Sequence, residues 1–330
     1  MKIQSSPIAV LGAGSWGTAL AIVLARNGNP THLWDIAADQ IQQMAEHRVN
    51  ETYLPDVEFP DAIQVFDNLA QAVSGVKDIL IAIPSHAFGN LLTSLKPHLM
   101  ADARIAWATK GLDKSSRLLH EVAYELLGEQ VKIAVLSGPT FAKEVAQGLP
   151  TAIALAANDK TFAEDLKQRL DSHIFRVFTS QDMVGIQLGG VVKNVLAIAS
   201  GISDGLGYGA NTRCAILTRG LHEMAQLGIA LGASRETFMG LAGLGDLILT
   251  GTDNQSRNRR FGLAIGQGYN ADEALAKINQ VVEGYYNSAQ VYQMAQRLKV
   301  RMPIIDTVYQ ILYQNLPAEQ AVVDFLANGE

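Results

Sequence analysis

Short apolar runs alternate with amphipathic, helix-like stretches up to about residue 183. Brief apolar runs bounded by polar or turn residues are typical of buried strands, and several are separated here by helical patterns, as at 17–27 and 115–127. Strands that alternate with helices predict a parallel sheet covered on both faces. The expected strands are 8–11, 31–34, 78–83, 104–108 and 132–136, with 152–156 and 175–178 extending the sheet.

The second half of the chain shows helical patterns and no clear strand. The long apolar stretch at 184–200 predicts one helix, and further helices are expected at 212–227, 271–279, 288–298, 307–314 and 318–327. The chain is therefore expected to be α/β, with a doubly wound sheet in an N-terminal domain, residues 1–185, followed by an all-helical C-terminal domain, residues 186–330.

Composition excludes several classes of protein. The 330 residues are 48% hydrophobic and 18% charged, which argues against a disordered chain. The formal net charge of −6 argues against a nucleic-acid partner. The single cysteine, Cys214, cannot form an intramolecular disulfide and is expected to pack inside the protein. No group of His, Cys and acidic residues has metal-site spacing, so no metal is expected.

The chain is also expected to be cytoplasmic and not inserted in a membrane. A transmembrane helix needs about 20 consecutive apolar residues, whereas the closest candidate, 191–207, is interrupted by charged and polar residues and by glycines. The first residues lack the apolar core of a signal peptide.

A glycine motif lies directly after the first predicted strand. Gly12-Ala13-Gly14-Ser15-Trp16-Gly17 fits the G-x-G-x-x-G pattern and opens the first helix, which is the context of a Rossmann-type dinucleotide loop. Gly12 is expected to form the tight turn, Gly14 to admit the pyrophosphate, and Gly17 to allow close packing. Ser15 and Trp16 are expected to touch the cofactor, although Trp16 fits a core aromatic equally well.

Asp35 lies at the end of the second predicted strand, 23 residues after Gly12. A carboxylate at this place accepts hydrogen bonds from ribose hydroxyls and repels a 2′-phosphate, so it favours NAD(H). The alternative is that Asp35 only caps the following helix.

Seven further segments make the pattern specific, and they lie at 83–88, 108–112, 136–142, 192–194, 243–247, 256–259 and 282–284. Together they resemble bacterial glycerol-3-phosphate dehydrogenase over nearly the whole chain. The resemblance implies a homodimeric, cytoplasmic enzyme that interconverts dihydroxyacetone phosphate, a phosphotriose, and sn-glycerol 3-phosphate with NAD(H) or NADP(H). It also implies that the enzyme supplies glycerol phosphate for phospholipids.

Lys193 is the expected catalytic residue. Reduction of a ketone leaves negative charge on oxygen, which requires a proton donor or a cation. Lys193 interrupts an apolar helix, where partial burial would lower its pKa. The residue type alone equally allows a lysine that extends to the surface, and the resemblance favours catalysis. Asp246 is expected to hold Lys193 or a substrate hydroxyl, with Thr250 beside it.

The phosphate is expected to bind at Ser256-Arg257-Asn258, because arginine offers paired N–H donors to phosphate. Arg259 is expected to be more peripheral, and the alternative is a solvated basic start of a helix. The resemblance implies further contacts to substrate and cofactor. These are Lys110, Gly138 and Thr140 for the substrate, and Lys110, Ala142, Arg257, Val281 and Glu283 for the cofactor.

Two alternatives remain open from the sequence. One is a 3-hydroxyacid or sugar-acid dehydrogenase of similar architecture. The other is a non-catalytic NAD(H) sensor, which would need the glycine loop but not Lys110, Lys193 and Arg257 together.

Overall fold

The computed structural model describes residues 6–321. The chain divides into two compact units. Residues up to 109 together with 119–183 form the first unit, and residues 110–118 together with those from 184 onward form the second.

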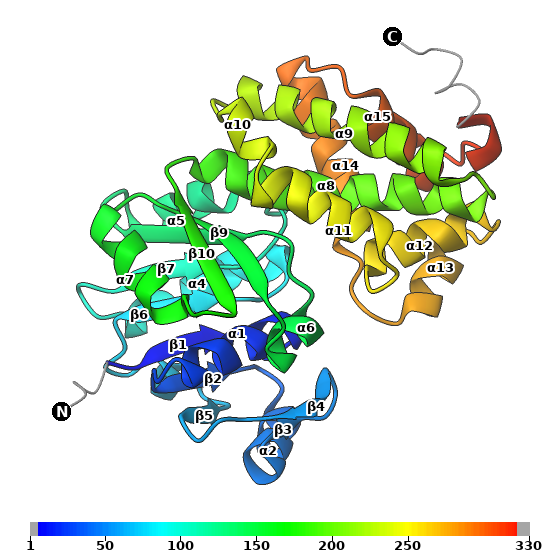
Figure 1. The fold of residues 1–330 in the computed structure, drawn as a ribbon. Coiled ribbons are helices and arrows are strands. Elements are labelled where there is room, and N and C mark those ends of the chain that lie inside the picture. The colour runs from blue at the N-terminus through cyan, green and yellow to red at the C-terminus, as the bar shows by residue number, and fades with distance from the viewer. Residues whose placement is uncertain (1–5, 322–330) are drawn as a thin grey trace. The chain divides into compact units, whose positions relative to one another are not determined.

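The first unit is built on a sheet of eight strands in the order β5-β2-β1-β6-β7-β8-β9-β10 (Figure 1). The strands from β5 to β8 are parallel, as predicted, but β9 runs antiparallel to β8 and β10 is parallel to β9. The sheet is therefore mixed. The strands are β1 (Ile8–Leu11), β2 (Thr31–Trp34), β5 (Ile63–Phe66), β6 (Asp78–Ile81), β7 (Arg104–Trp107), β8 (Lys132–Ser137), β9 (Thr151–Ala157) and β10 (Phe175–Ser180).

The reversal at β9 has a structural reason. A parallel neighbour needs a crossover connection that carries the chain back along the sheet. The short helix between β8 and β9, α6 (Ala142–Gln147), instead packs against α1 (Ser15–Arg26). The chain therefore enters β9 at the end of the sheet where it left β8, so the two strands run antiparallel.

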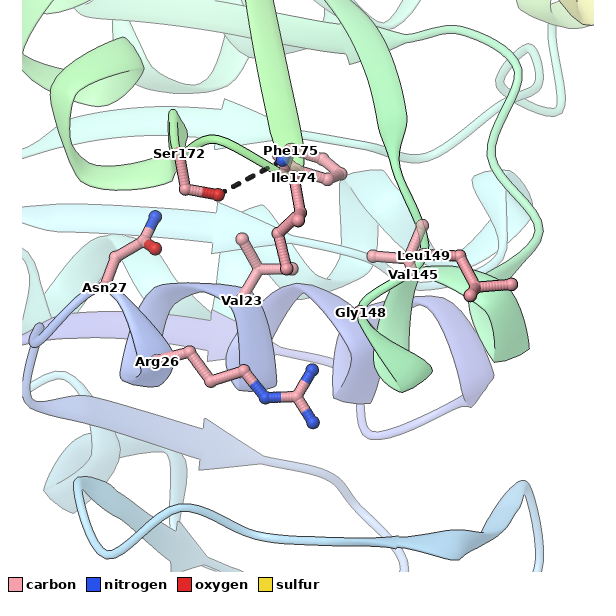
Figure 2. Close-up of a pocket in the computed structure, with 9 residues that line it drawn as sticks. All are labelled: Val23, Arg26, Asn27, Val145, Gly148, Leu149, Ser172, Ile174 and Phe175. Carbon is pink, nitrogen blue, oxygen red and sulfur yellow. Dashed lines mark hydrogen bonds between the residues drawn. The ribbon is translucent and has the colours of Figure 1, made fainter.

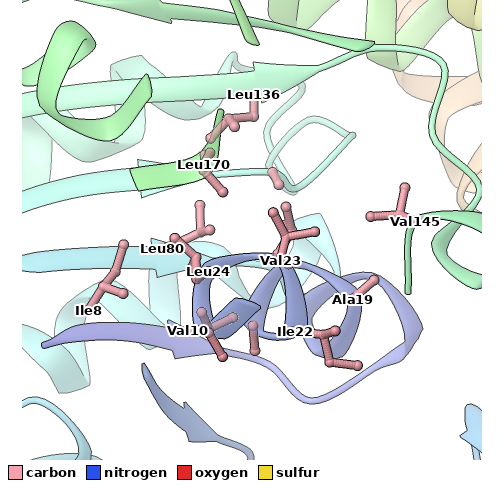
Figure 3. Close-up of a cluster of buried hydrophobic side chains, with 14 of the residues drawn as sticks. Ile8, Val10, Ala19, Ile22, Val23, Leu24, Leu80, Leu136, Val145 and Leu170 are labelled. Atoms are coloured by element: carbon pink, nitrogen blue, oxygen red, sulfur yellow. The ribbon is translucent and has the colours of Figure 1, made fainter. Parts of the chain in front are cut away.

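Both faces of the sheet are covered by helices, as expected for a doubly wound fold. On one face Val10 and Leu80 pack with Leu24 of α1 and Leu170 of α7 (Lys160–Leu170), as Figure 3 shows. On the other face Trp107 meets Phe88 of α4 (Phe88–Leu95) edge to face, with ring centroids 5.5 Å apart. The central strands are buried on both sides, which explains their uninterrupted apolar sequences.

Several elements of the first unit lie where no periodicity predicted them. The strand β5 was not predicted, nor was a small antiparallel pair of strands, and five helices also lie outside the predicted ranges. The helix expected at 115–127 begins only at Leu119, because Asp113 Oδ1 accepts hydrogen bonds from the backbone N–H groups of Ser115 and Arg117 in a turn. The unpredicted pair is β3 (Val49–Asn50) and β4 (Leu54–Glu58), and the unpredicted helices are α2 (Ala38–His47), α3 (Leu69–Ala72), α4, α6 and α7. The helix α5 spans Leu119–Leu127.

The second unit is helical, and no strand occurs among its described residues. Five of its helices have bounds within five residues of the predicted ones, whereas the helices at 235–238, 246–252 and 257–266 lie outside the predicted ranges. The predicted helix at 318–327 extends beyond residue 321, where the described residues end. The helices are α8 (Met183–Gly205), α9 (Ala210–Ala230), α10 (Arg235–Phe238), a π-helical turn (Leu241–Gly245), α11 (Asp246–Thr252), α12 (Arg257–Gly266), α13 (Ala271–Ile278), α14 (Glu283–Leu298) and α15 (Pro303–Tyr313).

The central helix of this unit is α8, which is buried from Gly185 to Ser203. It is long and apolar enough to cross a membrane, yet most of it lies inside the structure, as in the core helix of a soluble protein. Glycines bring α12 against it. A Cβ on Gly201 would lie 2.1 Å from the Arg259 carbonyl oxygen, and a Cβ on Gly262 would lie 2.2 Å from that of Ile198.

Two expectations are corrected here. The segment 110–118, expected in the N-terminal domain, belongs to the helical unit. There Leu112 and Leu118 join the helical core, and Gln290 Nε2 donates to the Asp113 carbonyl oxygen at 2.6 Å. Cys214 was expected to be packed inside the protein and is exposed on α9.

Candidate active site

A close approach of two backbones sets up the site. A Cβ on Gly189 of α8 would lie only 2.3 Å from the Ala242 carbonyl oxygen, so glycine is required for this contact. Ala242 lies in the π-helical turn that precedes α11. Lys193 follows Gly189 by four residues and Asp246 follows Ala242 by four, so each lies about one helical turn beyond the contact. The two side chains therefore meet.

Lys193 is buried, with 6% of its surface exposed. Its Nζ donates to Asp246 Oδ1 at 2.8 Å and to Thr250 Oγ1 at 2.7 Å. The other carboxylate oxygen of Asp246 accepts a hydrogen bond from Lys110 Nζ at 2.7 Å. The predicted contact of Asp246 with Lys193, and the place of Thr250 beside them, are confirmed, and Lys110 joins them. Lys110, Lys193, Asp246 and Thr250 together are called the lysine cluster.

The lysine cluster contains two lysine side chains and one carboxylate. Burial lowers the pKa of Lys193 to about 8; Asp246 opposes this shift, while the charges of Lys110 and Arg257 add to it. Burial alone would raise the pKa of Asp246, but Lys110 and Lys193 outweigh it and the pKa is lowered. The carboxylate therefore stays ionised, and Lys193 can gain or lose a proton near neutral pH. A buried amine of this kind is suited to general acid–base chemistry.

Asn258, expected to bind substrate, is engaged within the protein. Its Nδ2 donates to Asn194 Oδ1 at 2.9 Å, and its Oδ1 accepts a hydrogen bond from the backbone N–H of Gly284 at 2.9 Å, in the first turn of α14. Asn194 was not predicted as a site residue. The signal available was a second buried polar residue beside Lys193 in an apolar helix.

The start of α12 is tightly organised. Ser256 is the N-cap of the helix, and its side chain accepts a hydrogen bond from the backbone N–H of Arg259. Arg257 is half-buried at the first helical position, close enough to act on the pKa of Lys193. Arg259 was expected to be peripheral and is instead buried, with hydrogen bonds to Asp204, Gly251 and Asn254.

Two further predicted cofactor contacts lie at the start of α14. Val281 is 42% exposed just before α14, and Glu283 is the half-buried first residue of that helix.

In the first unit, the glycine motif has the predicted shape. Gly12 has a φ of +112°, and a Cβ there would lie 2.6 Å from the Ala82 carbonyl oxygen. A Cβ on Gly17 would lie 1.9 Å from the Gly12 carbonyl oxygen. The turn and packing roles of these two glycines are confirmed. At Gly14 nothing lies within 4 Å of a Cβ, so this position faces open space.

These features fit a dinucleotide. No side chain of the described residues caps α1, so its first N–H groups point toward the open space at Gly14 and attract anions. Asp35 Oδ2 accepts a hydrogen bond from the Ala13 backbone N–H at 2.7 Å and Oδ1 one from the Ala37 N–H at 3.1 Å, which fixes the carboxylate beside the loop. Trp16 packs against the core, and its buried Nε1 has no partner within residues 6–321.

The loop after β8 carries the remaining predicted residues of the first unit. Gly138 is buried, and Thr140 Oγ1 donates to its carbonyl oxygen at 3.2 Å. Ala142 is the half-buried first residue of α6. All three follow the carboxyl end of a strand, where doubly wound sheets bind ligands.

One pocket of the first unit lies elsewhere. It is found at the C-terminal end of α1, the end away from the glycine motif (Figure 2). Arg26 and Phe175 are among the residues that line it, and no predicted site residue does. An apolar groove of the second unit, between Ile202 of α8 and Val308 of α15, likewise contains no predicted site residue.

Comparisons with known proteins show the family of the chain. The chain matches the family models described as NAD-dependent glycerol-3-phosphate dehydrogenase N-terminus, over residues 7–163, and C-terminus, over residues 182–323. A glycerol-3-phosphate dehydrogenase (NAD(P)+) of Actinobacillus pleuropneumoniae is 55% identical over 327 residues, which cover 98% of this chain and 97% of the relative. That of Haemophilus influenzae is 55% identical over 331 residues, covering 100% and 99%.

Solved structures show the same relationship. The crystal structure of glycerol-3-phosphate dehydrogenase from Coxiella burnetii has a TM-score of 0.95 and 52% identity, and the match covers 98% of this chain and 99% of that chain. The Saccharomyces cerevisiae enzyme has a TM-score of 0.84 and 27% identity, with 96% and 98% covered. A D-mandelate dehydrogenase with NADH, at 15% identity and a TM-score of 0.61, shares the fold alone. The resemblance drawn from the motifs is confirmed: this chain belongs to the NAD-dependent glycerol-3-phosphate dehydrogenase family.

Proposed function

We propose that this chain interconverts dihydroxyacetone phosphate and sn-glycerol 3-phosphate, with Lys193 as the general acid and base. The observation that carries this assignment is the buried Lys193 ammonium, held at 2.8 Å from Asp246 and 2.7 Å from Thr250, with its pKa lowered to about 8. When bound, the nicotinamide dinucleotide supplies or accepts the hydride.

The lysine cluster then handles the proton. In reduction Lys193 gives a proton to the carbonyl oxygen as that oxygen becomes an alcohol, and in oxidation neutral Lys193 takes the hydroxyl proton back. Asp246 stays ionised between the two lysines and keeps the Nζ of each in place. Lys110, 16% exposed at its side chain, adds a second positive charge that favours a developing alkoxide.

The phosphate end is assigned to Arg257. It is half-buried at the first position of α12, where the helix dipole also favours an anion. Gly138 and Thr140 are assigned to the substrate as well, and Ser256 and Asn258 support it by shaping the start of α12 and the contact of that helix with α8 and α14.

The glycine motif and Asp35 of the first unit are assigned to the dinucleotide. Gly12, Gly14, Ser15, Trp16 and Gly17 would hold the pyrophosphate against α1. The charge of Asp35 supports a preference for NADH over NADPH, because a 2′-phosphate beside a carboxylate is repelled. Family resemblance further implies Lys110, Ala142, Arg257, Val281 and Glu283 as cofactor contacts.

Family resemblance also supports a cytoplasmic homodimer without membrane insertion that supplies glycerol phosphate for phospholipid synthesis. Light scattering of the purified protein tests the dimer by its mass.

The test of the function is oxidation of NADH and, separately, NADPH in the presence of dihydroxyacetone phosphate. We expect turnover with a higher kcat/KM for NADH, and a loss of about 100- to 10,000-fold in kcat for Lys193→Ala, the usual range for a general acid. Lys277→Ala, at an exposed lysine of α13, is the matched control and should retain activity. A folded protein that binds NADH but turns over neither dinucleotide would contradict the proposal; higher kcat/KM with NADPH would contradict the Asp35 assignment alone.

A further inference from the structure

The connection between α11 and α12, residues 253–256, joins the two ends of the proposed site. Asp246 and Thr250 of the lysine cluster belong to α11, and Arg257 begins α12. One substrate is bound at both ends, by its carbonyl and by its phosphate. The position of Arg257 relative to the lysine cluster therefore matters for the rate, since small misplacements of reacting groups are costly.

The buried side chain of Arg259 links this connection to α8 and α11 through hydrogen bonds. The Arg259 guanidinium donates from Nε to the Gly251 carbonyl oxygen at 3.2 Å, from Nη1 to Asn254 Oδ1, and from Nη2 to Asp204 Oδ2. These partners lie at the end of α11, in the connection itself, and near the end of α8. The planar fork of arginine can hold three such partners at once, whereas a lysine ammonium on its flexible stem does not reproduce that geometry.

Two of the three partners are held in other ways as well. Ser200 Oγ donates to the same Gly251 carbonyl oxygen at 2.5 Å, and Arg213 Nη1 donates to Asp204 Oδ2 at 2.8 Å. Asn254 is exposed, and within the described residues Arg259 is the only side chain that donates a hydrogen bond to it. The connection also has local hydrogen bonds, from the Gln255 N–H to Asp253 Oδ1 at 2.7 Å and from the Ser256 N–H to the Asp253 carbonyl oxygen at 3.1 Å. Loss of Arg259 would therefore keep this local turn but remove the link from Asn254 to Asp204 of α8, while Asp204 keeps a cationic partner and α11 keeps its anchor on α8.

We propose that Arg259 is a positioning residue that holds residues 253–256 so that Arg257 meets the substrate phosphate at a fixed distance from Lys193. The proposal rests on the phosphate role assigned to Arg257 above. It predicts a division of effects: Arg259 serves the phosphate end of the substrate, and the lysine cluster works without it.

The test compares dihydroxyacetone phosphate with dihydroxyacetone, which lacks the phosphate. The ratio of the two kcat/KM values measures what the enzyme gains from the phosphate. Arg259→Gln should lower this ratio by about tenfold to a hundredfold, the worth of charge-assisted hydrogen bonds to one anion. Activity on dihydroxyacetone and the pH dependence attributed to Lys193 should change little.

Matched controls separate positioning from general packing. Arg213→Gln removes the other cation on Asp204 without touching the connection, and Arg260→Gln changes the exposed neighbouring arginine. Both should keep the ratio of the wild type. Asn254→Ala removes the exposed end of the same contact, so it should lower the ratio in the same direction even where Arg259→Gln does not fold.

Arg257→Ala in the same series distinguishes the two proposals. If Arg257→Ala lowers the ratio and neither Arg259→Gln nor Asn254→Ala does, the positioning role is wrong and the phosphate site stands. An equal loss on both substrates in the Arg259 variant would also overturn it, since that is the result of a merely structural residue. If Arg257→Ala leaves the ratio unchanged, the phosphate assignment itself is wrong.

Discussion

At the scale of single residues, the buried charge of Lys193 is stabilised by the buried, opposite charge of Asp246. A buried lysine is unfavourable unless it is paired or loses its proton. Lys193 does some of each: Asp246 and Thr250 accept its hydrogen bonds, and its pKa is still lowered to about 8. Burial is the main cause of this lowered pKa, and the charge of Lys110, which shares Asp246 with Lys193, adds to it.

The pH dependence of the two directions of reaction should therefore be opposite. Reduction needs protonated Lys193, so its kcat/KM should fall about tenfold per pH unit above a pH of about 8. Oxidation needs the neutral amine, so its kcat/KM should fall below that pH. Initial rates between pH 6 and 10 in both directions give the measurement.

Lys193→Arg is the control for this prediction. It keeps a positive charge but cannot release a proton in this range, because the pKa of arginine lies above 12. Both profiles should lose their break, and the rates should be low. A break near pH 8 that persists in this variant would assign the titration to a different group.

At the scale of elements, α8 and the turn before α11 approach closely because residue 189 is a glycine and has no side chain. Gly189 lets the π-helical turn at Leu241–Gly245 touch the backbone of α8, and this contact sets where α11 begins. Such π-helical turns recur at functional sites because they re-aim the residues that follow. Here the residue re-aimed is Asp246.

Gly189→Ala should damage catalysis more than folding. A methyl group placed 2.3 Å from the Ala242 carbonyl oxygen must push α11 away from α8. Overpacking of this kind costs about 1–3 kcal/mol of stability, while a shift of about 1 Å between reacting groups can lower the rate about 100-fold. The measurement is kcat/KM together with the free energy of unfolding in urea.

Gly209→Ala provides the comparison, because a Cβ there meets nothing within 4 Å and the residue is exposed. It should leave both quantities near the wild-type values. If Gly189→Ala were as active as Gly209→Ala, the contact between α8 and the π-helical turn would not set the position of Asp246.

At the scale of the whole molecule, stability rests on two hydrophobic cores and on buried charges outside the site. Glu223 of α9 is one of these: its carboxylate accepts hydrogen bonds from the N–H groups of Ile304 and Ile305 at the start of α15. Those bonds favour the ionised form, but burial and the nearby Asp306 outweigh them and raise the pKa of Glu223 to about 7. The folded protein thus holds a proton that the unfolded chain releases near pH 4.5.

The sign of the resulting pH dependence follows from linkage. A raised pKa in the folded state means that the stabilisation is complete below about pH 4.5 and is lost as the pH rises through about 7. Relative to Glu223→Gln, which does not titrate, the wild type should lose about 3 kcal/mol of unfolding free energy between pH 4.5 and 8. Urea unfolding of both proteins across this range is the measurement, and parallel curves would show that Glu223 does not titrate as described.

Much of the fold is already specified by local sequence. Fully apolar runs such as β1 and β6 predict strands of a doubly wound sheet, and the glycine motif after β1 predicts the turn that the structure shows, because only glycine fits the φ of Gly12 and the gap at Gly17. Part of the lysine cluster was predicted as well: Asp246 was expected to hold Lys193, with Thr250 beside it, and the structure confirms both contacts. The bond from Lys110 to Asp246 was not predicted, because nothing in a separation of 136 positions along the chain indicates that the two residues touch.

The tertiary structure decided what depends on contacts between distant residues. The antiparallel turn at β9 follows from the packing of α6 on α1, and the place of residues 110–118 follows from Leu112 and Asp113 meeting the helical unit. The burial of Arg259 follows from Asp204, 55 positions away. The sequence by itself determined which residues could form strands, turns and charged groups, because those properties are local. Which charges share a partner, and hence which lysine titrates near neutral pH, was decided only when folding excluded water around them.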